Sequence, residues 1–127
     1  MSETRRFYHC THISRAREIV QGMSIEPRHA TGSLSVSWWV QLPQLLWAIN
    51  HIAVKWEAPH ADIVVFWADV RLDRMRRYLD RGLFCSHYSI APAGMVAASI
   101  LLDDDFEFAN FDLRKVIQEG FVYHVGE

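Results

Sequence analysis

The sequence predicts an α+β fold in which a mixed, mainly antiparallel sheet carries two or three packed helices. Strand-like and helix-like segments alternate along residues 5–70, and the rest of the chain is rich in strand-like segments. This order is typical of a sheet with helices packed on it. A length of 127 residues suits one core, so we expect a single domain over residues 1–127.

The first part of the chain predicts a strand, a helix and a loop. Residues 5–11 are strand-like, and Ser14 can cap a helix that runs to about residue 21. Gly22 is typical of the residue that ends such a helix. Proline, glycine and serine then indicate a loop over residues 23–33.

Residues 34–40 predict a second strand, because apolar and polar side chains alternate along them. The alternation puts Ser35 and Ser37 on one face with Trp39. The opposite face is apolar and comprises Leu34, Val36, Trp38 and Val40. We therefore expect this strand to be buried on one face.

A second helix and a strongly apolar strand follow. Pro43 suits the first turn of the helix, which we expect over residues 43–56. Residues 62–70 are apolar on both faces, which is typical of a central strand covered on two sides. The apolar stripe of the helix comprises Leu45, Ile49, Ile52 and Trp56, and Leu46 and Ala53 widen it.

The charged segment at residues 73–81 predicts a short helix that ends at Gly82. Residues 95–102 form a strand or, equally, a buried helical segment, because a short apolar run has no distinguishing period. A turn or helix is expected at residues 112–119. The other strand candidates are 83–90, 105–111 and 121–125.

The composition excludes several classes of protein. Hydrophobic residues make up 50% and charged residues 22%, which is typical of a globular domain and not of a disordered chain. The net charge of −2 gives no general attraction to nucleic acid. No apolar signal segment opens the chain, and the apolar run at 95–102 is too short to span a membrane. With only two cysteines, we expect a cytoplasmic protein with free thiols.

Two pairs of residues suggest a metal site as one alternative. Cys10 with His12, and Cys85 with His87, would each present two ligands on one face of a strand, and together they would suit Zn²⁺. Both spacings are shorter than the usual zinc knuckle, so we favour buried thiols and expect no metal. A cysteine nucleophile beside a histidine is a further alternative that no local motif supports.

Two charged clusters have ordinary structural explanations. Asp103, Asp104 and Asp105 with Glu107 could hold a cation, but no ligand loop surrounds them, so a charged turn is favoured. The second cluster could grip phosphates, but its basic and acidic residues interleave, which favours a solvated helix face. Its members are Arg71, Arg74, Arg76, Arg77 and Arg81, with Asp69, Asp73 and Asp80.

The run Y-H-C-T at residues 8–11, followed by a helix and Gly22, resembles the opening segment of ADP-ribosyltransferase-like domains. It is most similar to the DNA-modifying toxins among them. The order of strands and helices extends the resemblance over residues 7–72. It implies an ADP-ribosyltransferase-like fold and a cleft that binds NAD, in which the strand histidine bonds the adenosine-side ribose.

The resemblance also implies roles for individual residues. His9 would orient the ribose, Thr11 and Ser35 would add hydrogen bonds, and Trp38 would stack on the nicotinamide. The family places its catalytic acid on a late strand, where Glu107 is the candidate and Glu119 the alternative. Ordinary structural roles stay open as well. His9 could bond a neighbouring backbone group, and the serine could face solvent.

Two classes of function follow. The first is an NAD-dependent ADP-ribosyltransferase-like enzyme, or a binding relic of one, with an unknown acceptor. The second is a non-catalytic interaction module that homodimerises through an aromatic-rich apolar surface containing Trp38, Trp39 or residues 95–102.

Overall fold

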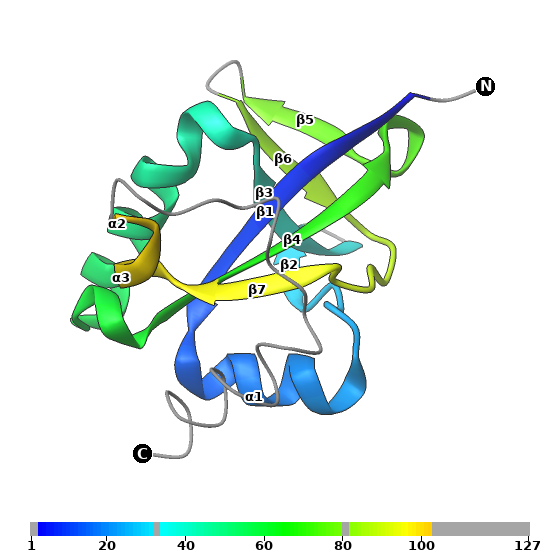
Figure 1. The fold of residues 1–127 in the computed structure, drawn as a ribbon. Helices are drawn as coiled ribbons and strands as arrows, with labels where there is room; N and C mark the ends of the chain where they lie inside the picture. The colour runs from blue at the N-terminus through cyan, green and yellow to red at the C-terminus, as the bar shows by residue number, and fades with distance from the viewer. Residues whose placement is uncertain (1–2, 32–33, 80–81, 103–127) are drawn as a thin grey trace.

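The computed structural model describes residues 3–31, 34–79 and 82–102 and has an α+β fold built on an antiparallel sheet (Figure 1). Six strands follow one another in the order β5-β6-β3-β1-β4-β7, and β2 pairs with β3 beside this path. The strands are β1 (Thr4–His12), β2 (His29–Thr31), β3 (Leu34–Val40), β4 (Ile63–Arg71), β5 (Arg76–Leu79), β6 (Leu83–Ser86) and β7 (Gly94–Ala97). The helices are α1 (Ile13–Gly22), α2 (Leu45–Trp56) and α3 (Ala98–Leu101), with 3-10 turns η1 (Leu42–Gln44), η2 (His60–Asp62) and η3 (Leu72–Arg74).

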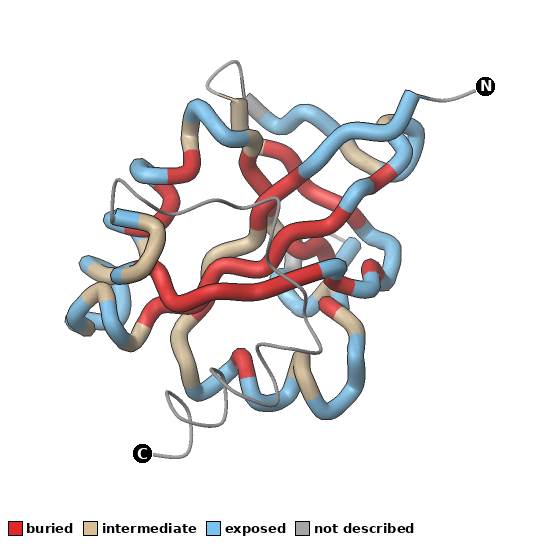
Figure 2. Tube along the Cα trace, in the orientation of Figure 1, coloured by how far each residue is buried: buried red, intermediate tan, exposed pale blue. Residues whose placement is uncertain are grey.

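Strand β4 lies between β1 and β7 and is buried on both faces, as the sequence predicts. Its register with β1 is unbroken from Thr4 opposite Arg71 to His12 opposite Ile63. Figure 2 shows the buried stretch that runs along these central strands. This pair of strands is the fixed centre on which the rest of the sheet is built.

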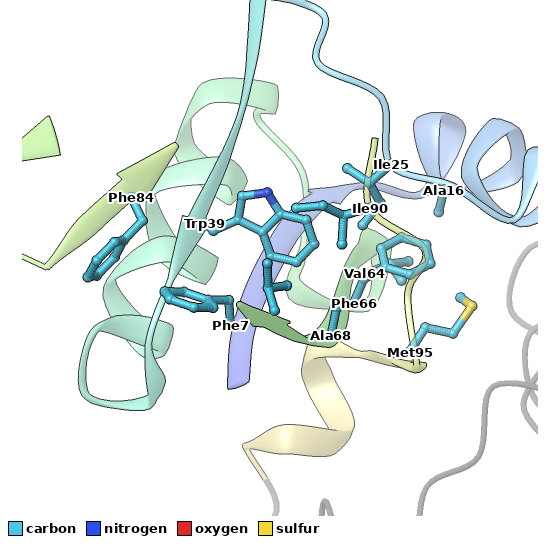
Figure 3. Close-up of a cluster of buried hydrophobic side chains, with 11 residues drawn as sticks. Phe7, Ala16, Ile25, Trp39, Val64, Phe66, Ala68, Phe84, Ile90 and Met95 are labelled. Carbon is cyan, nitrogen blue, oxygen red and sulfur yellow. The ribbon is translucent and has the colours of Figure 1, made fainter. Parts of the chain in front are cut away.

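The two faces of the sheet carry separate cores. On one face Ala16 of α1 belongs to the same buried cluster as Phe7, Trp39 and Phe66, which Figure 3 shows. The other face carries α2 and α3, and its core comprises Tyr8, Val40, Leu45, Ala48, Ile49, Ile63, Val65, Trp67, Val96 and Ala98. Because the two helices expected near the start of the chain lie on opposite faces, they cover different sides of β1.

The ends of α1 differ from those expected. His12 is the N-cap, and its ring Nδ1 accepts a hydrogen bond from the Ser14 N–H at 3.1 Å. Gly22 belongs to the helix, and Met23 takes the left-handed conformation with φ 52°. The Met23 N–H donates to the carbonyl groups of Ile19 and Val20. Met23 therefore ends the helix in the conformation that glycine commonly adopts at this position.

The helix predicted at residues 73–81 is wrong. Its described residues, 73–79, lie in the turn η3 and then in the edge strand β5, which pairs with β6. Charged side chains suit an edge strand because one edge and both faces can reach water. Leu46 is also 55% exposed, so it does not widen the buried stripe of α2 as expected.

Strand β3 is buried on both faces near its end, not on one face as its alternation predicts. Trp39 joins the core under α1, while Val40 joins the core under α2. Residues 95–102 combine the two alternatives, because β7 ends at Ala97 and α3 begins at Ala98. The elements expected at 105–111, 112–119 and 121–125 lie outside the described residues.

No helix in the described part of the chain has the length and apolar character needed to cross a membrane.

We predict that Gly94→Ala strongly destabilises the fold. A Cβ at this position would lie 2.1 Å from Cζ2 of the Trp67 ring, in a buried part of β7. Overpacking of this kind typically costs about 1–3 kcal/mol, and this contact is severe enough for the upper end of that range. Urea denaturation of wild type and variant measures the loss of unfolding free energy.

Gly22→Ala is the matched control, because nothing lies within 4 Å of the Cβ that it adds. It should leave the unfolding free energy unchanged or raise it slightly. Equal losses for the two variants would contradict the packing described for Gly94.

Candidate functional site

A cleft of about 380 Å³ opens where β1 and β3 separate; we call it the main cleft. The two strands are paired at Tyr8 and Val40 and then diverge, whereas β1 stays paired with β4 along its whole length. Helix α1, the end of α2 and the segment leading to β2 complete its walls. The volume falls within the range of about 300–1,000 Å³ that is usual for small-molecule sites.

His9 lies at the point of separation and lines the main cleft. Its Nδ1 is 2.7 Å from the carbonyl oxygen of Trp38. A carbonyl only accepts, so Nδ1 carries the hydrogen and donates, which leaves the lone pair of the neutral ring on Nε2. Burial lowers the pKa of His9 below its ordinary value, and the bond to Trp38 opposes that shift only in part. The ring is therefore neutral at pH 7 and presents an acceptor.

Of the other predicted ligand-binding residues, two line the main cleft and one does not. Thr11 is 6% exposed and lines the main cleft, and half-buried Trp38 lines it as well. Ser35 is exposed and is not part of the lining. Ser37 lines the cleft instead, and its Oγ accepts a hydrogen bond from Nε1 of Trp39 at 2.7 Å. The structure thus brings together three of the four residues implied by the resemblance.

Cationic side chains that the sequence analysis did not single out also line the main cleft. Arg15 comes from α1, Arg28 from the segment before β2, and Lys55 from the end of α2. Arg28 is paired with Glu18 at 2.7 Å. No motif links these three residues because they come from separate elements that only the fold brings together.

An aromatic bridge joins the two helices beside the main cleft. The rings of His12 and Trp56 stack with their centroids 4.6 Å apart, and the Arg15 guanidinium lies 5.7 Å from the Trp56 ring centroid. The start of α1 is thereby held against the end of α2. Arg15 and Trp56 both line the cleft, so this contact fixes the position of one cation and one ring in its wall.

Glu26 is a second carboxylate in the wall. It accepts hydrogen bonds from the hydroxyl groups of Ser89 and Ser24, which lower its pKa together with the nearby Arg28 charge. The group is exposed and ionised at neutral pH. Glu107 and Glu119, the two candidates for a catalytic acid, lie outside the described residues.

The cysteines do not support the alternative chemistries. Cys10 is on β1 and Cys85 on β6, with β3 between these strands. Burial raises the pKa of Cys10 to about 12 and also raises the pKa of Cys85, which the Arg76 charge partly offsets. A thiol must lose its proton to act as a nucleophile, so neither is activated. Over residues 3–31, 34–79 and 82–102, no three His, Cys, Asp or Glu side chains gather as metal ligands would.

Comparisons of the chain with protein-family models, with curated proteins and with solved structures gave no match.

We predict that His9 makes the fold sensitive to acid. The unfolded chain takes up a proton on His9 below about pH 6.5, whereas the folded chain resists protonation until a lower pH because its pKa is lowered. The unfolding free energy should therefore fall as the pH decreases from 6.5, by at most about 1.4 kcal/mol per pH unit. Urea denaturation between pH 5 and 7.5 measures the slope.

His9→Gln should flatten this slope, because the glutamine amide does not titrate. His60→Gln, at a histidine that bonds Asn50 outside the main cleft, should retain it. A slope that is unaltered in His9→Gln would show that other groups cause the acid sensitivity.

Proposed function

We propose that the chain binds NAD in the main cleft and transfers ADP-ribose from it to an acceptor. One observation carries the proposal: His9 lines the main cleft, its Nδ1 bonds the Trp38 carbonyl, and no described residue bonds its Nε2. An acceptor in a polar cleft suits a ligand hydroxyl group. The resemblance of residues 7–72 to ADP-ribosyltransferase-like domains selects the ribose of NAD as that ligand.

The geometry around His9 suits a ribose. No described residue bonds its Nε2, and no side-chain nitrogen or oxygen in the described structure is both fully buried and unpartnered. The lone pair is therefore within reach of a group that enters the cleft. Thr11, two residues along the same strand, adds a hydroxyl group to the same wall. A hydroxyl both donates and accepts, so the two residues together could bond a ribose diol.

The cations suit the pyrophosphate of NAD. Lys55 and Arg15 lie in the wall, and neither forms an ion pair with a carboxylate of the described residues. Arg28 is shared with Glu18, so its charge is partly neutralised. Charge-assisted bonds of lysine and arginine to phosphate oxygens are among the stronger hydrogen bonds in proteins.

The aromatic residues suit the rings of the cofactor. Trp38 and Trp56 line the main cleft from β3 and from the end of α2. Trp38 meets Tyr78 edge to face at 4.8 Å, which steadies its indole. Stacking on such a ring gains about 0.5–1.5 kcal/mol beyond burial of the area. We assign the nicotinamide to Trp38.

The transfer step requires an acidic residue beside the ribose, and we assign this role to Glu107. In that step the bond between the nicotinamide ring nitrogen and the ribose carbon breaks, and nicotinamide leaves with the electron pair. An acceptor nucleophile bonds the ribose carbon and loses its proton. A carboxylate beside the ribose would stabilise the positive charge that develops there.

We predict that NAD binding depends on His9. His9→Ala should weaken NAD binding about three- to tenfold, because it removes one acceptor and the support of the Trp38 carbonyl. Isothermal titration calorimetry of the wild type and the variant measures both affinities. His60→Ala is the control and should bind NAD as the wild type does. No heat of binding at millimolar NAD, or equal affinities for wild type and His9→Ala, would contradict the proposal.

Glu107→Gln separates binding from transfer. It should keep the NAD affinity and abolish release of nicotinamide, which chromatography detects. If Glu119→Gln alone abolishes the release, the acid is Glu119 and the assignment to Glu107 is wrong.

Homodimerisation is the second candidate function, and one observation favours it. Large apolar side chains stay exposed along α2 and the turn before it: Leu42, Leu46, Trp47 and Val54. The surface expected at 95–102 is less suitable, because Met95, Val96 and Ala98 lie in the cores of the chain itself.

Light scattering tests this candidate. An interface on α2 predicts the mass of two chains for the wild type and of one chain for the double variant Leu46→Glu, Val54→Glu. The mass of a single chain for the wild type at about 100 μM would exclude a stable dimer.

A further inference from the structure

A second, smaller pocket of about 200 Å³ lies between α2 and the strands β1, β3 and β6; we call it the aromatic pocket. It adjoins the main cleft, because His29, Trp38 and Lys55 line both. Trp47 and His51 line the aromatic pocket and are not part of the main-cleft lining. The two hollows are therefore neighbours that share part of their walls.

Aromatic rings stand on both sides of this pocket. Trp47 and His51 belong to α2 and stack with their centroids 5.1 Å apart and an angle of 17° between the rings. Trp38 belongs to β3 and lines the sheet side, where His29 meets it at 5.6 Å. Trp47 is 52% exposed, so much of its indole is available for a further contact.

The charge of the lining has one sign. Among the described residues of this lining, Lys55 carries a permanent charge. The lining residues that the structure describes include no Asp or Glu, and no carboxylate of the described chain pairs with Lys55. Lys55 lines both hollows, so its ammonium group favours a ligand with a negative group.

We propose that the aromatic pocket binds a small planar aromatic carboxylate, with its ring between Trp38 and Trp47 and its carboxylate on Lys55. The volume lies below the range of about 300–1,000 Å³ that drug-sized ligands occupy, so the ring system is limited to one or two fused rings. Tyr8 and Leu83 also border the pocket and add apolar surface for the ring. This site shares Trp38 and Lys55 with the cleft proposed for NAD, so we expect the two ligands to compete, but the carboxylate needs no bound NAD.

Indole-3-acetate is the probe, and calorimetry on the full chain is the measurement. We expect it to bind, and we expect tryptamine, which has the same ring with a cationic arm, to bind at least tenfold more weakly or not at all. Acetate, which lacks the ring, should not bind. Equal affinity for indole-3-acetate and tryptamine, or no binding of either at millimolar concentration, would overturn the proposal.

Three variants locate the site. Lys55→Gln should weaken binding of indole-3-acetate about tenfold and leave neutral indole unaffected. Trp47→Leu should weaken both ligands about two- to tenfold. Leu46→Ala is the control, because this exposed neighbour on α2 is outside the lining and should have no effect.

His9→Ala distinguishes this site from the one proposed for NAD. His9 lines the main cleft and not the aromatic pocket, so His9→Ala should retain the full affinity for indole-3-acetate. Trp47→Leu should conversely retain the affinity for NAD. Loss of indole-3-acetate binding in His9→Ala would place the probe in the main cleft and overturn the proposal.

Discussion

The hydrogen bond from the His9 ring to the Trp38 carbonyl holds the place where two neighbouring strands separate. A backbone carbonyl that loses its strand partner must find another donor, because an unsatisfied buried group costs about 1–3 kcal/mol. Strand β1 cannot move to supply one, since β4 pairs with it along its full length. The side chain of β1 supplies the donor in place of its backbone, at 2.7 Å. This contact keeps the Trp38 carbonyl bonded at the place where the sheet opens on one side of β1.

The sequence predicts the centre of the fold well and its edges poorly. The double-sided burial of β4 agrees with its apolar run, which is typical of a strand covered on both faces. The local sequence pattern fails to predict secondary structure where tertiary contacts decide it. At residues 73–81 the charged side chains suit a helix, but they also suit the edge strand that β5 forms there. It fails again in β3, whose Trp39 and Val40 face different cores because helices cover both faces of the sheet. The structure predicted for residues 103–127 lies outside the described residues.

The sequence analysis likewise named some residues of the candidate site and missed others. His9 and Thr11 were implied by the resemblance of the Y-H-C-T run to ADP-ribosyltransferase-like domains, and both line the main cleft. The serines of β3 differ in a way that strict alternation hides: Ser35 is exposed, and Ser37 is buried in the wall. The cations could not be found, because Arg15 and the others come from elements that are distant in sequence. A site made by the divergence of two strands is visible only once their pairing is known.

The neutral state of His9 ties the stability of the fold to the chemistry of the cleft. The lone pair of Nε2 exists only while the ring is neutral, and burial is what keeps it neutral. A proton on Nε2 would turn an acceptor into a donor and place a charge beside buried Trp39, whose ring lies 5.3 Å away. The same desolvation therefore costs the folded chain stability in acid and preserves the acceptor that a ligand hydroxyl needs. Replacing His9 with a non-titrating residue should therefore remove the acid sensitivity and the Nε2 acceptor together.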